Sequence, residues 1–144
     1  MALAAGAVFG WLVGEWSFVR EIPGQASMTG RATVSPMDMS TALYEEWAEV
    51  RLAGGEILHG EQRYLYRKRE AGLAVLFAET LALFHELEFH VEVDGCLRAV
   101  ARHACSDDVY MSEYRIGEDE SFAVRHEVRG PRKDYVIHTQ YRRR

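Results

Sequence analysis

Residues 12–22 read LVGEWSFVREI, and this segment decides the fold that the sequence predicts. From Trp16 to Ile22 every second position carries a large side chain (Trp, Phe, Arg, Ile), and the positions between them carry Ser, Val and Glu. An alternation of period two is typical of a strand with one buried face. The segment therefore predicts a first strand that begins near residue 15, with Trp16 as its first large buried side chain.

The rest of the chain repeats this pattern of short alternating segments between turn residues. Successive short turns predict an antiparallel meander, which has to close on itself or leave an unpaired edge. We therefore predict an all-β fold, a closed antiparallel up-and-down β-barrel of about ten strands with an interior cavity. A two-sheet sandwich is the alternative. A short helix in the Ala-rich opening, residues 1–14, is expected to lie across one end. The expected strands are residues 15–22, 25–35, 41–52, 56–68, 72–79, 82–93, 97–105, 108–116, 121–129 and 133–142.

Length and composition indicate one folded domain over residues 1–144. Hydrophobic residues make up 48% and charged residues 27% of the chain, which excludes a disordered protein. The net charge of -5 argues against a nucleic-acid partner, because binding to phosphates needs a basic face. The apolar opening is too short to span a bilayer, so no membrane contact is expected. Cys96 and Cys105 lie at the two ends of one expected strand, which predicts free thiols and a reducing, cytoplasmic location.

Three histidines, His85, His103 and His126, fall on the apolar parity of three different expected strands. Side chains on that parity point into a barrel, so we expect the three imidazoles to line the cavity. They are candidates for metal ligands, a haem ligand or an acid and base pair. The plainer interpretation is that each is half-buried and hydrogen-bonded to a neighbour. No two of them share the close spacing of a metal site, so no metal is expected. The same parities add three aromatic residues to the expected cavity lining: Phe89, Phe122 and Tyr135.

The fourth expected strand, residues 56–68, leaves its orientation open. Tyr64 and Tyr66 share one parity, and Arg63 and Arg67 share the other. If Arg63 points inward, it is a candidate clamp for a ligand carboxylate, because a guanidinium presents a fixed fork of donors. If it points outward, it is a solvated partner of a glutamate on the next strand. We include Arg63 among the candidate ligand-binding residues.

Five segments together resemble a bacterial family of domains of unknown function that is grouped with the calycin barrels. They are, in chain order, GEWSFVREI, RYLYR, FHELEF, HACSDDVY and GPRKDY. The resemblance implies a calycin-like barrel, similar to lipocalins, fatty-acid-binding proteins and nitrobindins, and it brings no established activity. In lipocalins the tryptophan of a Gly-x-Trp motif packs under an arginine of the last strand, which implies a structural plug of Trp16 with Arg142 or Arg143. Nitrobindins carry their haem histidine on the last strand, where His138 is the only histidine and has the outward parity.

These features favour a soluble barrel that binds one small molecule in its cavity. The ligand is expected to be partly apolar, with or without an acidic group, and no catalytic residue or cofactor is assigned. The first alternative is a lipocalin-like barrel enzyme of the decarboxylase or cyclase kind, which uses interior residues for proton transfer. The second is a haem-binding barrel similar to the nitrobindins. The oligomeric state stays open, a homodimer included.

Overall fold

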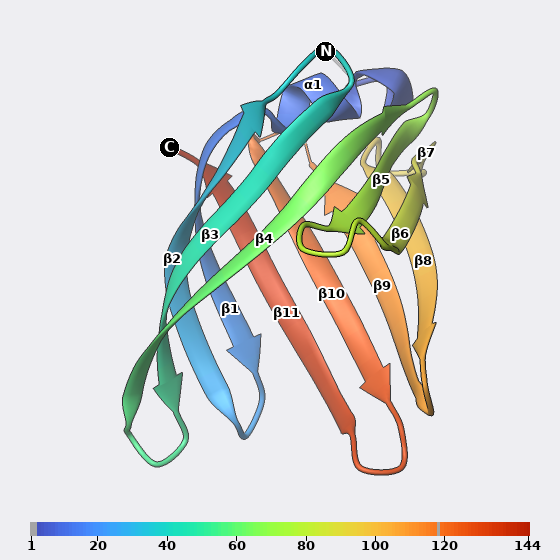
Figure 1. Ribbon diagram of the computed structural model, residues 1–144. Coiled ribbons are helices and arrows are strands. Elements are labelled where there is room, and N and C mark those ends of the chain that lie inside the picture. The colour runs from blue at the N-terminus through green and yellow to red at the C-terminus, as the bar shows by residue number, and fades with distance from the viewer. Residues whose placement is uncertain (1–2, 118) are drawn as a thin grey trace.

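The computed structural model describes residues 3–117 and 119–144, which form an all-β, antiparallel, nearly closed barrel with a short helical segment at its start (Figure 1). This confirms the predicted fold class. The helical segment consists of the 3-10 turn η1 (Ala5–Ala7) and α1 (Val8–Leu12), and it lies across the upper end of the barrel. Neither of these helical elements, the two in the described residues, is long and apolar enough to cross a membrane.

In the residues that the structure describes, eleven strands follow the helical segment, and each expected strand is found close to its expected bounds. The strands are β1 (Gly14–Ile22), β2 (Ala26–Pro36), β3 (Thr41–Leu52), β4 (Ile57–Arg69), β5 (Gly72–Phe77), β6 (Leu83–Glu88), β7 (His90–Val91), β8 (Leu97–Cys105), β9 (Asp108–Ile116), β10 (Ser121–Arg129) and β11 (Asp134–Arg143). Successive strands pair as a meander, and β1 also pairs with β11, so that the first and last strands are neighbours.

The barrel closes at the sixth expected strand, which the structure divides into β6 and β7. β6 pairs with β5, and β7 pairs with β8, so this one segment joins the two edges of the sheet. The division falls at Phe89, whose side chain is buried and whose N–H donates to the carbonyl of Ala71 (2.8 Å). The ten expected strands therefore become eleven.

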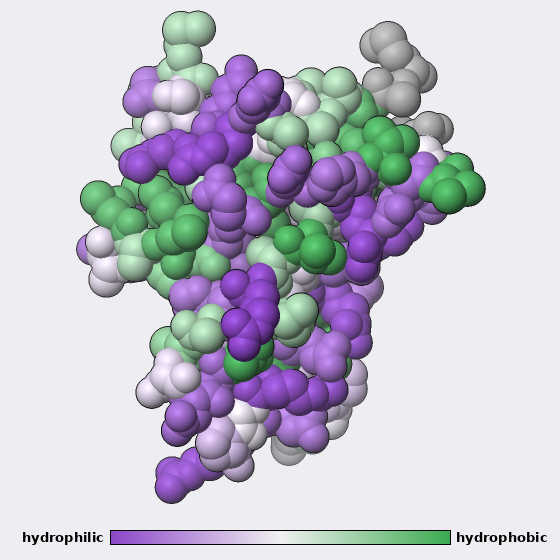
Figure 2. Space-filling view, turned by 90° about the vertical axis from the view of Figure 1, so that its right-hand side faces the viewer, coloured by the Kyte–Doolittle hydropathy of each residue, from purple (hydrophilic) through white to green (hydrophobic). Residues whose placement is uncertain are grey.

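The pairing at this junction covers only the upper part of the barrel. β5 pairs with β4 from Tyr64 to Arg69, and β7 pairs with β8 at Leu97 and Arg98. In the described part of the chain, residues 57–63 of β4 have no strand on that side, and they are exposed on both faces apart from Gly60. Figure 2 views the side that lies on the right of Figure 1, and it shows hydrophobic residues gathered over the upper half and a mostly hydrophilic lower half. The lower half is the open end of the barrel.

A β-bulge at the start of β6 changes which of its side chains point inward. Val75 of β5 pairs with His85 and Leu76 pairs with Leu83, which leaves Phe84 as the extra residue. Phe84 and His85 consequently both lie on the inner face, with their rings stacked at 3.7 Å. A strict alternation that places His85 and Phe89 inward would place Phe84 on the outer face, and it is therefore wrong at Phe84. It is also wrong at Leu83, which is 48% exposed.

The upper end of the barrel is plugged by Trp16. Its side chain is fully buried, and its indole N–H donates to the carbonyl of Leu12 (2.9 Å), which ties β1 to α1. The edge of the Trp16 ring also meets Phe122 of β10, with ring centroids 4.8 Å apart. The plug thus connects the helix, the first strand and β10, which lies two strands away from β1 in the sheet.

Arg143 is the arginine that covers Trp16. Its guanidinium carbon lies 4.1 Å from the ring centroid, close enough for cation–π attraction. The same group donates to the backbone carbonyls of Val13 (3.0 Å) and Trp11 (2.6 Å), which satisfies the end of the short helix. Gly14 is needed beneath it, because its φ is +137° and an added Cβ would lie 3.0 Å from the guanidinium.

Arg142, the second candidate for this contact, does not contribute to the plug. It directly precedes Arg143 on β11, and adjacent residues of a strand point to opposite faces. Its side chain is exposed and lies 3.9 Å from Asp119. The expectation that included Arg142 in the plug is therefore corrected.

Replacing Trp16 by alanine should lower the free energy of unfolding by about 3–5 kcal/mol, because it removes a fully buried aromatic ring and the surface on which Arg143 stacks. Urea unfolding followed by far-UV circular dichroism measures this loss. The matched control is Trp47→Ala, because Trp47 is 44% exposed on the outer face. This control should change stability by about 0.5 kcal/mol or less. Equal losses in the two variants would show that Trp16 does not plug the barrel.

Candidate functional site

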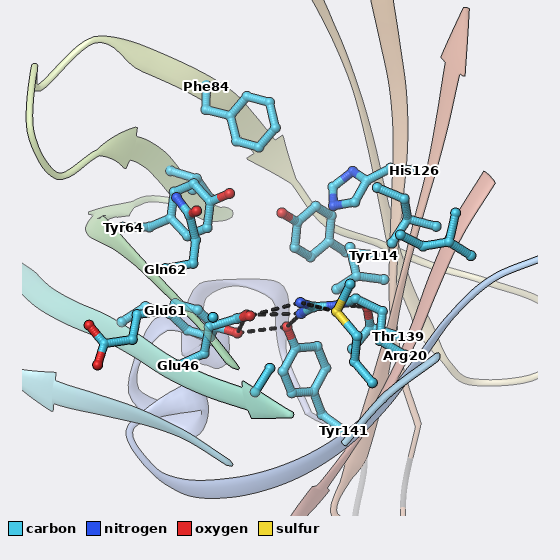
Figure 3. A pocket seen from close by; sticks show the side chains of 18 of the residues that line it. Arg20, Glu46, Glu61, Gln62, Tyr64, Phe84, Tyr114, His126, Thr139 and Tyr141 are labelled. Atoms are coloured by element: carbon cyan, nitrogen blue, oxygen red, sulfur yellow. Dashed lines mark hydrogen bonds and ion pairs between the residues drawn. The ribbon is translucent and has the colours of Figure 1, made fainter. Parts of the chain in front are cut away.

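The interior of the barrel contains a substantial cavity that opens toward its lower end. Its volume is about 300 Å³, at the small end of the range for sites that bind small molecules. Figure 3 shows side chains from both walls pointing into it. It is lined by Arg20, Ile22, Met28, Tyr44, Glu46, Ala48, Val50, Gly60, Glu61, Gln62, Tyr64, Tyr66, Val75, Phe84, Tyr114, Val124, His126, Ile137, Thr139 and Tyr141.

A buried ion pair between Arg20 of β1 and Glu46 of β3 forms the floor of this cavity. The two terminal guanidinium nitrogens of Arg20 donate to the two carboxylate oxygens of Glu46, at 2.7 and 2.9 Å. The hydroxyl of Tyr44 donates to the same carboxylate (2.6 Å) and lies 2.8 Å from the hydroxyl of Tyr141. A charge pair can be buried in this way because further hydrogen bonds satisfy both partners.

The other N–H groups of Arg20 also donate hydrogen bonds to groups within the protein. Its Nε donates to the hydroxyl of Thr139 (2.8 Å), and its Nη2 also reaches the hydroxyl of Tyr141 (3.4 Å). Burial by itself lowers the pKa of Arg20, but the hydrogen bond and charge of Glu46 outweigh it and raise the pKa above its ordinary value. Arg20 is therefore a charged group that is already neutralised, and a ligand anion would have to compete with Glu46 for it.

The opposite wall carries a chain of hydrogen bonds between four side chains. The Nδ1 of His126 lies 2.6 Å from the hydroxyl of Ser112, and this hydroxyl lies 3.0 Å from the Nε2 of His85. The Nδ1 of His85 lies 3.1 Å from the hydroxyl of Tyr114. The chain starts and ends in the cavity lining, at His126 and Tyr114, and passes behind it through Ser112 and His85.

Both histidines of this chain are neutral near neutral pH. Burial, together with the nearby charge of Arg20, lowers the pKa of His126 to about 4. Burial, with contributions from His126 and His103, lowers the pKa of His85 to about 3. Each imidazole therefore carries a single N–H and can act as a donor at one nitrogen and as an acceptor at the other.

An aromatic surface forms the third part of the cavity wall. Tyr64 stacks on Phe84, with ring centroids 5.8 Å apart and an interplanar angle of 11°, and Tyr44 stacks on Tyr66 at 5.6 Å. The hydroxyls of Tyr64 and Tyr66 form no hydrogen bond with any other described residue. Burial raises the pKa of both phenols, so they stay protonated. This wall offers flat apolar surface with two available hydroxyl groups.

The structure separates the three histidines that were expected to share the cavity. His126 contacts the cavity, and His85 is buried directly behind the wall, as its parity indicates. His103 is half-buried on β8, where its ring lies 5.2 Å from Phe84, outside the cavity lining. In the described residues, no group of three or more His, Cys, Asp or Glu side chains could hold a metal ion.

Four other candidate residues lie away from the cavity. Arg63 is on the outer face, with a 54% exposed side chain 3.8 Å from Glu45, so its candidacy as an inward clamp is corrected. Phe89 and Phe122 do point inward, but they fill the closed upper end below α1, where packed side chains leave almost no space. Tyr135 is half-buried near the lower end of β11 and does not line the cavity.

Sequence reasoning missed the residues that make the floor and the back of the site. Arg20 and Glu46 did carry a signal, because each is a charged residue on the same parity as large apolar neighbours. Arg20 follows Trp16 and Phe18 at two-residue spacing, and Glu46 follows Tyr44. Ser112 carried no signal, since a serine on an inward parity is common. Only the pairing of β9 with β10, which places Ser112 opposite His126, shows its role.

The fold and the site together define a small β-barrel with one polar and aromatic interior cavity. Residues 12–143 match a family of unknown function (DUF6314), and the chain belongs to this family. A comparison with curated proteins finds no match.

Three solved structures of β-barrels are similar to this chain. The first is EF1p2_mFAP2b bound to DFHBI, with 9% identity and a TM-score of 0.50, over 99% of this chain and 100% of that one. The second is the redesigned barrel mFAP1 bound to DFHBI, with 11% identity and a TM-score of 0.46, over 94% and 98%. The third is a de novo designed fluorescence-activating β-barrel, with 14% identity and a TM-score of 0.44, over 96% and 98%. At 9% identity, the similarity to the first of these supports the barrel fold alone.

Replacing Glu46 by glutamine should lower the free energy of unfolding by about 3 kcal/mol or more, because it leaves the buried charge of Arg20 without a counter-charge. The matched control is Glu45→Gln on the neighbouring outward position, where the ion pair with Arg63 is solvent-exposed. This change should cost about 1 kcal/mol or less. Urea unfolding of both variants tests the difference, and equal costs would contradict a buried, paired Glu46.

The two neutral histidines should make the protein less stable in mild acid. Their folded pKa values, about 3 and about 4, lie below the ordinary value of 6.5, so the unfolded chain binds protons first as the pH falls. The neutral histidines contribute fully to the free energy of unfolding above pH 6.5. This contribution decreases toward pH 4, by up to about 2 kcal/mol for each histidine between pH 6.5 and pH 5. Urea unfolding at pH 7.5 and pH 5 measures the decrease. In a His85→Gln, His126→Gln double variant the decrease should be smaller, and an unchanged decrease would refute the assignment.

Proposed function

We propose that this protein binds one neutral, partly apolar small molecule in the barrel cavity. The supporting observation is that three cavity groups have no protein partner among the described residues, whereas Arg20 and Glu46 beside them are paired with each other. The three groups are the hydroxyls of Tyr64 and Tyr66 and the Nε2 nitrogen of His126. A ligand with one or two oxygen atoms can hydrogen-bond to these groups, while its apolar part lies against the aromatic wall.

The paired state of Arg20 is the reason for proposing a neutral ligand. An anionic ligand would have to break a two-point hydrogen-bonded contact with Glu46 and leave that carboxylate buried without its partner. A neutral ligand leaves the pair intact and uses it as a fixed polar floor. An acidic group on the ligand, which the sequence left open, is therefore not part of the proposal.

The haem-binding alternative has little support in this cavity. The histidine that a nitrobindin-like site would need is His138, and it is exposed on the outer face of β11. Haem held in that manner does not fit the described residues, and no step of the proposed function uses it.

The proposal is tested by closing the cavity at Gly60. Gly60 lies in the lining, and an added Cβ would meet only Val50, at an ordinary contact distance of 4.0 Å. Gly60→Leu should therefore fold normally and place its side chain in the cavity. The probes are neutral aromatic ketones and phenols, with benzoylacetone first, and binding is followed by two-dimensional NMR of labelled protein. The wild type should bind at least one probe, and Gly60→Leu should weaken this binding by at least about tenfold.

The matched control is His59→Leu, which adds the same side chain at the adjacent position on the exposed outer face. It should bind the probe as the wild type does. Native mass spectrometry of the purified wild type provides a second measurement, because a retained natural ligand should be absent from Gly60→Leu. Equal binding by all three proteins would place the ligand outside the cavity and contradict the proposal.

A further inference from the structure

The hydrogen-bonded chain behind the cavity has both of its ends in the same space. It begins at His126, passes through Ser112 and His85, and ends at Tyr114. The rings of His126 and Tyr114 both line the cavity, with centroids 6.4 Å apart (Figure 3). One small molecule can therefore contact both ends at once.

The hydrogen atoms of this chain allow two arrangements. The hydroxyl of Ser112 has one hydrogen and lies between two imidazole nitrogens, so it donates to one histidine and accepts from the other. Each neutral imidazole has one N–H, so the direction at Ser112 sets the tautomer of both rings. In the first arrangement His85 and His126 both carry hydrogen on Nδ1. In the second arrangement both carry it on Nε2.

The two ends of the chain change their roles together. In the first arrangement, Nε2 of His126 is an acceptor toward the cavity, and the Tyr114 hydroxyl accepts from His85 and has its own hydrogen available for the cavity. In the second arrangement, Nε2 of His126 is a donor, and Tyr114 donates to His85 and presents only lone pairs. The cavity wall therefore always presents one donor and one acceptor.

We propose that this chain is a proton relay that catalyses a 1,3-proton shift, the interconversion of keto and enol forms, in a neutral carbonyl compound bound in the cavity. This inference rests on the proposed function, because it needs a ligand in that cavity. His126 and Tyr114 are the catalytic residues, since they are the groups that touch the ligand. Ser112 and His85 act through them.

The step balances without any further reactant. The carbon next to the carbonyl loses its proton to Nε2 of His126, and the Nδ1 proton of His126 moves to Ser112. The hydroxyl proton of Ser112 moves to Nε2 of His85, and the Nδ1 proton of His85 moves to Tyr114. The Tyr114 hydroxyl proton then bonds to the carbonyl oxygen, while the electron pair of the broken C–H bond forms the C=C bond. After the enol leaves, a water molecule that contacts both ends returns the relay to its first arrangement.

The relay suits a buried site because no side chain gains a net charge. Each of the four residues receives one proton and gives up one proton. Isolated charges are costly in a cavity of low polarity, and burial already disfavours the imidazolium forms of His85 and His126, whose pKa values are lowered. A concerted shift along the chain avoids those forms.

The test is a break at Ser112, which is buried behind the lining. Ser112→Ala removes the shared hydroxyl and leaves every cavity group in place. The probe is benzoylacetone, whose keto and enol forms differ in ultraviolet absorbance. The wild type should accelerate their equilibration, and Ser112→Ala should lose this acceleration by about 10²–10⁴-fold. Binding of the probe, measured by NMR, should change less than about threefold in the variant. The control is Ser121→Ala, a buried serine of β10 outside the relay, which should keep the wild-type rate.

A second readout needs no substrate. The ¹⁵N chemical shifts of the two imidazoles report which nitrogen carries hydrogen, and in the wild type His85 and His126 should be the same tautomer. In Ser112→Ala this agreement should be lost, because nothing then couples the two rings. Opposite tautomers in the wild type would overturn the relay, whatever the rate measurements show.

The outcomes separate this inference from the proposed function. If the wild type binds benzoylacetone without accelerating its equilibration, the relay is wrong and the binding function stands. If Ser112→Ala accelerates equilibration as well as the wild type, the relay is also wrong. If no neutral ketone or phenol binds to the wild type, the proposed function fails, and the keto–enol activity fails with it.

Discussion

The stacking of Arg143 on Trp16 is the contact on which the closed end of this barrel depends. It joins the last residue of β11 to the first large side chain of β1, and hydrogen bonds from the same guanidinium hold the end of the short helix. Because one end is closed in this way, the interior becomes a pocket with a single open end instead of a channel. The requirement also explains Gly14, since the backbone there has a positive φ and an added Cβ would lie only 3.0 Å from the guanidinium.

Below the plug, the interior of the barrel contains many polar side chains. In a packed core such groups are destabilising unless they are hydrogen-bonded. The floor pairs Arg20 with Glu46, and two tyrosine hydroxyls complete their hydrogen bonds. Every side-chain nitrogen or oxygen atom of the described residues that is sealed off from both the surface and the cavity has a hydrogen-bond partner. A buried polar network of this kind is costly when any member is missing, so it holds each side chain in one position. Fixed donors and acceptors around a cavity are what selective binding of a small molecule requires.

The open side of the lower half follows from the short pairing at the junction of β6 and β7. β5 ends at Phe77, so residues 57–63 of β4 have no strand beside them in the described residues, and β7 pairs with β8 only at Leu97 and Arg98. The segment between β5 and β8 is further interrupted by the bulge at Phe84 and the break at Phe89, and both phenylalanine side chains lie inside. Phe84 thereby joins Tyr64 in the aromatic wall. The same irregularity that weakens the closure builds part of the binding surface.

The sequence by itself determined the strands, their order and the inner face of most of them. Alternation along β1 and β10 placed Trp16 and His126 correctly because a strand's two faces follow from local geometry alone. How far along the barrel a side chain lies, and which side chains it contacts there, do not follow from alternation. Phe122 and His126 share an inward parity, yet one is packed at the closed end and the other contacts the cavity. The pairing of Arg20 with Glu46 skips the strand between β1 and β3, and Ser112 joins His126 on the adjacent strand to His85 on β6. Only the tertiary structure decided these contacts, because a hydrogen bond inside a barrel requires side chains of different strands to reach the same height, which depends on register and twist.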